Sequence, residues 1–197
     1  MRVSHQLHRS LAAVGFAVLL AGCGGDVVAP SAIDRPSAIS TSLSTVTSFV
    51  YDPAVGGAFE FGPQHRISFS AGAVCDPLLS TYGVGEWDAT CTPLTTPITI
   101  TARSYVASNG HPRVDFTPSL RFVPGSEVVL FLRDKDAAGI AGTVLQWCDE
   151  ANQCVTEPAP LPSFETKRDA ALGMVFRSIK HFSGYMISVG RTELDAL

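Results

Sequence analysis

The sequence predicts an all-β protein, an antiparallel β-sandwich that follows a signal peptide and a flexible N-terminal tether. After about residue 45, short runs rich in β-branched and aromatic residues alternate with turns that contain Gly and Pro. Ile98, Ile100 and Ala102 alternate with polar residues, so one face of this strand should lie on a core. The stretch 128–132 is apolar on both faces, as in a strand covered on both sides. Two packed sheets accommodate both patterns.

Residues 1–22 have the pattern of a secretory signal. Arg2 and Arg9 precede an uncharged apolar run at 11–20, which is about half of the roughly 20 residues needed to cross a bilayer. The segment ends in Leu-Ala-Gly-Cys at 20–23, which resembles the lipobox of bacterial lipoproteins, where a peptidase cuts before a cysteine that receives a diacylglyceryl group. We therefore expect Cys23 to be lipidated and to begin the mature chain.

The next segment, residues 23–45, is expected to be the lipidated cysteine and a flexible linker. Residues 24–44 are rich in Ser, Ala, Gly and Pro and contain no aromatic residue, so they cannot bury a core. Gly24 stands where the inner-membrane retention rule of enterobacteria requires Asp. The expected location is therefore the bacterial cell envelope, lipid-anchored at the outer membrane and facing an extracytoplasmic space. Residues 46–197 are expected to form the sandwich domain.

Within this domain the expected strands end at turn residues. They cover 46–51, 58–61, 66–69, 98–105, 114–116, 127–133, 143–148, 174–179 and 185–189. One short helix is predicted at 163–172, with Ser163 near its N-terminal cap. The sequence contains no internal repeat, which disfavours propellers and solenoids.

The charge balance bears on the partners of the protein. The 14 Lys and Arg residues are outnumbered by 18 Asp and Glu residues, and removal of Arg2 and Arg9 with the signal leaves 12 against 18, a net charge of −6. A chain without a basic surplus has no electrostatic footprint for a polyanion, so nucleic acid is not expected as a partner. The expected partners are the membrane, through the N-terminal lipid, and an envelope protein or glycan.

Four cysteines remain besides Cys23, namely Cys75, Cys91, Cys148 and Cys154. An even number of cysteines in an exported chain indicates disulfides, and four cysteines allow three pairings. Proximity in the sequence favours Cys75 with Cys91 and Cys148 with Cys154. Neither pair has the spacing of a zinc knuckle, so no metal is expected.

Three stretches of the sequence resemble the ZU-type (ZU-five) domain, a β-sandwich found in zonula occludens proteins, ankyrins and netrin receptors. Gly56–Phe59 resembles the opening of that domain, and Ile67–Val74 resembles its I-x-(I/F)-P-x-G-A-(I/V) signature. Phe116–Pro118 with Leu130–Asp134 resembles its later strands. The similarity covers roughly residues 50–138 and resumes at 181–189. It implies the fold, whereas function depends on the residues of individual sites.

The triplet His181-Phe182-Ser183 resembles the self-cleavage motif of some ZU domains. That resemblance implies attack of Ser183 Oγ on the Phe182 carbonyl, with His181 accepting the hydroxyl proton and water hydrolysing the ester. Gly184 can adopt unusual backbone angles that would favour this step. The alternative is structural: His181 and Ser183 lie on one strand face while Phe182 packs inward. The expected function is a non-enzymatic binding or structural module, with self-cleavage between Phe182 and Ser183 as an alternative.

Two further patterns have a functional and a structural interpretation. Tyr82 and Trp87 can form an aromatic platform for a carbohydrate, which would make the protein a glycan-binding accessory lipoprotein, or they can cover the edge of the core. The stretch 134–139 begins like a calcium loop, but Ala138 and Leu145 stand at positions that need ligands, so a charged turn is expected. No cofactor is expected. Motifs of enzymes that act on other molecules, such as G-x-S-x-G, do not occur.

Replacement of Cys23 by Ser should prevent lipid attachment and leave an unlipidated precursor or a released chain, because the thiol is the acceptor of the lipid. Metabolic labelling with a fatty-acid analogue measures this directly. The wild-type chain should carry label and C23S should not. A wild-type chain without label would contradict the predicted anchor.

Overall fold

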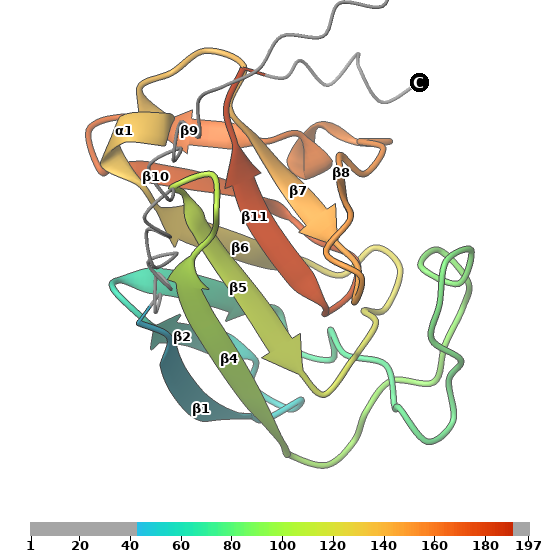
Figure 1. Ribbon diagram of the computed structural model, residues 1–197. Helices are drawn as coiled ribbons and strands as arrows, with labels where there is room; N and C mark the ends of the chain where they lie inside the picture. Colours follow the sequence, from blue (N-terminus) through green and yellow to red (C-terminus); the bar gives the residue numbers. More distant parts are fainter. Residues whose placement is uncertain (1–42, 191–197) are drawn as a thin grey trace, which may run out of the picture. The chain divides into compact units, whose positions relative to one another are not determined.

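The computed structural model describes residues 43–190 (Figure 1). The signal peptide, Cys23 and most of the predicted linker lie outside the described residues. No helix in the described part of the chain is long and apolar enough to cross a membrane.

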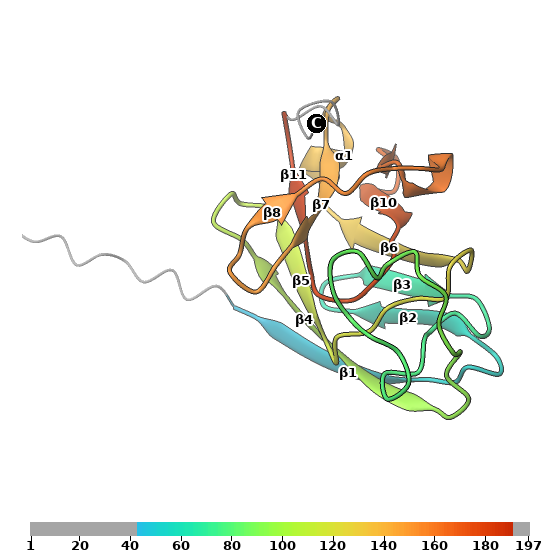
Figure 2. The ribbon, with the colours of Figure 1, turned by 90° about the vertical axis from the view of Figure 1, so that its right-hand side faces the viewer.

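The described residues form two antiparallel sheets, which confirms the all-β sandwich. The first sheet has six strands in the order β1-β4-β5-β11-β7-β8, and the second has five in the order β2-β3-β6-β10-β9 (Figures 1 and 2). In the first sheet the bounds are β1 Thr45–Tyr51, β4 Ile98–Val106, β5 Pro112–Thr117, β7 Val144–Cys148, β8 Cys154–Val155 and β11 Gly184–Ser188. In the second they are β2 Gly57–Phe61, β3 His65–Phe69, β6 Val128–Arg133, β9 Lys167–Asp169 and β10 Met174–Ser178.

The alternation predicted for residues 98–103 is confirmed by burial along β4. Ile100 and Ala102 are buried, whereas Thr99 and Arg103 are exposed. β6 differs from the prediction, because only Val128, Leu130 and Leu132 are fully buried. Its other face is covered in part by side chains of its own sheet: Phe131 stacks on Phe176, with ring centroids 5.1 Å apart, and the Arg66 guanidinium lies 4.2 Å from the Phe131 ring.

The helix predicted at 163–172 is wrong. This segment contains a 3-10 turn, Pro162–Phe164, followed by the short edge strand β9, whose Lys167 pairs with Phe176 of β10. Ladder hydrogen bonds to β10 therefore override the local helical preference. A short helix, α1 (Lys135–Ala138), lies instead where a charged turn was expected, because the Asp134 side chain accepts hydrogen bonds from the backbone N–H groups of residues 136 and 137.

Both predicted disulfides are confirmed. Cys75 pairs with Cys91 across a sequence separation of 16, and Cys148 pairs with Cys154 across a separation of 6. The second bond closes the β7–β8 hairpin, where the two cysteines lie opposite each other. The first closes a loop in the long β3–β4 connection, which runs along one end of the sandwich (Figure 1).

His65, on β3, is almost completely buried and serves as a hydrogen-bond acceptor. Its Nδ1 atom accepts from the backbone N–H of Arg133, 2.9 Å away, so the ring at this position is neutral. Burial lowers the pKa of His65 to about 4, against an attractive effect of Asp134 that raises it.

Acidification should therefore destabilise the domain through His65. His65 binds a proton near pH 6.5 in the unfolded chain and only near pH 4 in the folded chain. The free energy of unfolding is therefore highest above pH 6.5 and decreases as the pH falls from 6.5 to 4. The total loss should be about 3 kcal/mol. Urea unfolding at several pH values measures it. His65→Gln should flatten the dependence between pH 6.5 and 4, and an unchanged slope in that variant would contradict the assignment.

Candidate functional site

The segment 180–183, immediately before β11, carries the residues of the predicted self-cleavage motif. Its backbone is fixed on a neighbouring segment, because Phe122 N donates to Lys180 O at 2.9 Å and Phe116 N donates to Ser183 O at 3.0 Å. Phe182 is fully buried, and its ring stacks on that of Phe116 with centroids 4.3 Å apart. The inward packing of Phe182 is confirmed. His181 and Ser183 lie just before β11 and not within it, but their side chains are on the same side of the segment, with His181 Nδ1 3.5 Å from Ser183 Oγ.

His181 lies between a hydroxyl group and a carboxylate. Its Nδ1 atom is 3.5 Å from Ser183 Oγ, and its Nε2 atom is 2.9 Å from Glu157 Oε1. Because the carboxylate accepts a hydrogen bond, Nε2 carries the hydrogen and Nδ1 can accept the hydroxyl proton. Trp147 Nε1 donates to Ser183 Oγ at 2.5 Å, which leaves the serine hydrogen available for His181. This order of carboxylate, imidazole and hydroxyl is typical of an activated nucleophile.

Glu157 is positioned by a buried arginine on the other sheet. Arg177, on β10, has only 1% of its surface exposed, and its Nη2 atom donates to the Glu157 carbonyl oxygen at 3.5 Å. Its Nη1 atom donates to Leu145 O, on β7, at 3.2 Å. The guanidinium therefore links the two sheets and fixes the loop from which the Glu157 side chain reaches His181.

Tyr82 and Trp87, the two aromatic residues proposed for ligand binding, cover His181 and Phe182. They belong to residues 75–91, which we call the 75–91 loop. The Trp87 ring stacks on His181, with centroids 3.8 Å apart and planes inclined by 20°. Tyr82 packs edge-on against Trp87, and its hydroxyl donates a hydrogen bond to the carbonyl oxygen of Phe182. One face of Trp87 is thus already occupied within the protein.

The 75–91 loop is held on the sandwich by a buried guanidinium. Arg121, of which 4% is exposed, donates from Nη1 to the carbonyl oxygens of Glu86 and Ala89, each at 2.5 Å. Its Nη2 atom donates to Thr90 O at 3.2 Å. Outside the buried part, Lys180 Nζ and Asp88 form an ion pair at 2.8 Å. The loop is therefore fixed over the site mainly through its backbone carbonyl groups.

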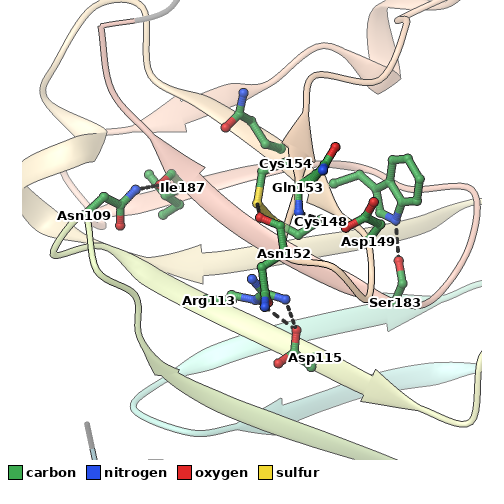
Figure 3. Close-up of a disulfide and its surroundings, with 12 residues drawn as sticks. Asn109, Arg113, Asp115, Cys148, Asp149, Asn152, Gln153, Cys154, Ser183 and Ile187 are labelled. Carbon is green, nitrogen blue, oxygen red and sulfur yellow. Dashed lines mark hydrogen bonds and ion pairs between the residues drawn. A yellow bond between two sulfur atoms is a disulfide. The ribbon is translucent and has the colours of Figure 1, made fainter. Parts of the chain in front are cut away.

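An open cleft of about 740 Å³ lies beside Ser183. Tyr82, Trp87 and Trp147 contribute to its lining, together with the turn of the β7–β8 hairpin. Figure 3 shows Ser183 near the Cys148–Cys154 disulfide that closes this hairpin. Solvent water can thus approach the hydroxyl of Ser183, which is only partly buried.

Gly184 contributes close packing and not the unusual backbone angles expected of it. Its φ lies outside the left-handed region. A Cβ atom at this position would lie 2.7 Å from Asp115 Oδ1, 2.9 Å from Arg113 Nη2 and 3.1 Å from Cys148 O. Figure 3 shows the Arg113–Asp115 ion pair that occupies this space. The absence of a side chain at Gly184 lets β11 pair with β5 right beside this ion pair.

The sequence points to His181, Ser183, Tyr82 and Trp87 but not to Glu157 or Trp147. Glu157 lies in a proline-containing loop without any motif, and Trp147 has the pattern of an ordinary strand residue. Nothing in their local sequence signals the contacts that the fold creates. Among residues 43–190, no group of three or more His, Cys, Asp or Glu side chains is arranged to hold a metal ion.

Comparisons with protein-family models, with curated proteins and with solved structures found no match. The similarity to ZU domains stays a prediction from the sequence.

Gly184→Ala should destabilise the domain by about 1–3 kcal/mol, because the new methyl group overlaps the Arg113–Asp115 ion pair. Gly139→Ala is the matched control: Gly139 has φ −83° and its Cβ would make only an ordinary contact, 3.6 Å from Asp136 O. This control should be neutral or slightly stabilising. Urea unfolding measures both variants, and equal stabilities would contradict the close-packing role.

Proposed function

We propose that this domain cleaves its own chain between Phe182 and Ser183. The observation that carries the proposal is the ordered set of Ser183 Oγ, His181 and Glu157, with His181 Nδ1 3.5 Å from the hydroxyl and Nε2 2.9 Å from the carboxylate. The nucleophile lies on the residue that follows the carbonyl it would attack. No second molecule has to be bound and oriented.

The reaction follows from these positions. Ser183 Oγ–H gives its proton to His181 Nδ1, while Oγ forms a bond to the carbonyl carbon of Phe182. The bond from that carbon to the Ser183 nitrogen then breaks, and the nitrogen takes the proton back from His181. The result is an ester between Phe182 and the Ser183 side chain. Water from the cleft hydrolyses the ester, which leaves a carboxylate on Phe182 and a free hydroxyl and amino group on Ser183.

The C-terminal piece would stay in the fold after cleavage. β11 pairs with β5 on one side and with β7 on the other. Tyr185 and Ile187 of this strand are completely buried. Two hydrogen-bonded ladders and these side chains hold the strand, so the product is a nicked sandwich and not two separated parts.

We place this domain in the bacterial cell envelope, attached to the outer membrane through a lipid on Cys23. The lipobox-like sequence supports the anchor, and the Cys75–Cys91 and Cys148–Cys154 disulfides support an oxidising compartment. Both supports are independent of the proposed cleavage.

A second candidate function is non-enzymatic binding of a glycan or an envelope protein. The open cleft of about 740 Å³, lined in part by Tyr82, Trp87 and Trp147, favours it. A glycan array with purified protein tests this candidate. Binding lost in a variant with Trp147→Ala and retained in Ser183→Ala would assign the cleft to a ligand and not to cleavage.

Self-cleavage should appear as two species in intact-mass measurements under denaturing conditions, the smaller one corresponding to residues 183–197. Ser183→Ala removes the nucleophile and should abolish the split. Ser188→Ala, on β11, is the matched control and should cleave like the wild type. The rate should be independent of protein concentration, because the reaction is intramolecular. A single full-length species after long incubation of folded, oxidised protein would overturn the proposal.

A further inference from the structure

We infer that Tyr82 is a catalytic residue of this self-cleavage, and that the Cys75–Cys91 disulfide serves to deliver it to the Phe182 carbonyl oxygen. The inference rests on the proposed function. It assigns a chemical role to the 75–91 loop, whose aromatic residues the sequence associates with ligand binding or with cover of the core.

The position of the Tyr82 hydroxyl decides its role. It donates a hydrogen bond to the carbonyl oxygen of Phe182, which gains negative charge when Ser183 Oγ adds to the carbonyl carbon. A donor fixed at this oxygen before the reaction stabilises the tetrahedral intermediate more than it stabilises the starting amide. Ser183 supplies the nucleophile and His181 the base. Tyr82 supplies the hydrogen-bond donor that stabilises the negative charge on the carbonyl oxygen.

The surroundings keep the Tyr82 phenol in its donating form. Burial raises the pKa of Tyr82 by more than the nearby hydroxyl groups of Ser183 and Ser119 lower it. The phenol therefore remains protonated at neutral pH. Its ring packs edge-on against Trp87, which itself stacks on His181, so the base and the donor are held by one aromatic stack.

The loop that carries Tyr82 has little packing of its own. Leu78, Leu79 and Val84 are strongly exposed, so hydrophobic burial does not hold the outer part of the loop. The base of the loop is closed by the Cys75–Cys91 bond and by a hydrogen bond from Asp76 N to Thr92 O at 2.8 Å. A covalent crosslink at this point restricts the conformations of the loop and keeps Tyr82 near its target.

The separation of Tyr82 and Phe182 along the chain determines when the hydroxyl donor reaches the scissile bond. Tyr82 and Phe182 are separated by 100 residues in the sequence. The donor meets the scissile bond only after both sheets have formed and the loop has closed. A chain whose Cys75 and Cys91 are still reduced therefore has its nucleophile and base but a poorly placed donor. Cleavage should accordingly be slow before export and oxidation and fast afterwards.

The test compares cleavage rates of purified, folded protein by intact mass. Tyr82→Phe keeps the ring and removes the hydroxyl, and it should slow cleavage on the order of 10²–10³-fold. Tyr105→Phe is the matched control, because Tyr105 Oη donates to Asp115 Oδ2 at 2.9 Å and not to the Phe182 carbonyl oxygen. It should cleave at the wild-type rate. Circular dichroism verifies that each variant is folded.

The disulfide is tested in parallel with the double variant Cys75→Ser and Cys91→Ser, which should also cleave more slowly than the wild type. The control is Leu78→Ser with Leu79→Ser, which changes two exposed side chains of the same loop and should retain cleavage. Proteolysis of the 75–91 loop in the folded proteins reports its docking, and the loop should be cut faster when Cys75 and Cys91 are not bonded, because the Arg121 hydrogen bonds then hold it without the crosslink. A loop that stays protected in the Cys75/Cys91 variant, with unchanged cleavage, would overturn the role of the disulfide.

The outcomes separate this inference from the function on which it rests. If oxidised wild-type protein does not cleave, the proposed function fails and the inference fails with it. If the wild type cleaves and Ser183→Ala does not, the proposed function stands. In that case wild-type rates in Tyr82→Phe would overturn the catalytic role of Tyr82 alone.

Discussion

Burial of the Phe182 ring is the constraint on which the site depends. The ring is fully buried, stacks on Phe116 and meets Phe69 and Phe122 edge-on, with centroids 5.9 and 5.0 Å away. Such a contact ties the segment before β11 to both sheets, since Phe69 lies on β3 and Phe116 on β5. With this side chain fixed inward, the flanking residues His181 and Ser183 turn toward the 75–91 loop and the β7–β8 hairpin.

Two buried guanidinium groups hold the other parts of the site in place. Their removal from water is unfavourable, and hydrogen bonds must offset this cost. Arg177 and Arg121 are both nearly inaccessible, and each donates to backbone carbonyl groups and not to a carboxylate. A buried guanidinium without such partners would be strongly destabilising. The partners hold Glu157 through Arg177 and the 75–91 loop through Arg121. The same bonds that make these charges tolerable therefore position the two elements that reach His181.

The sequence predicted the sandwich because its strands alternate visibly, as at Ile100 and Ala102, and because turns separate them. It predicted the cysteine pairs because each pair is close in the sequence. It could not predict β9, whose Lys167 and Arg168 are paired only because β10 offers a free edge. Glu157 escaped prediction for a similar reason, since its role is created by a contact with His181 across 24 residues. Local patterns report secondary structure, whereas a site assembled from several loops depends on tertiary contacts.

The position of the proposed scissile bond would allow the fold to undergo this reaction without losing its structure. Phe182 and Ser183 lie before β11, and β11 occupies an inner position of the six-stranded sheet between β5 and β7. The backbone groups on either side of the bond have partners of their own, Leu120 for Phe182 N and Phe116 for Ser183 O. Breaking the peptide bond removes none of these contacts. Cleavage would therefore change the covalent structure of the chain while the hydrogen bonds and the aromatic core continue to hold both ends in place.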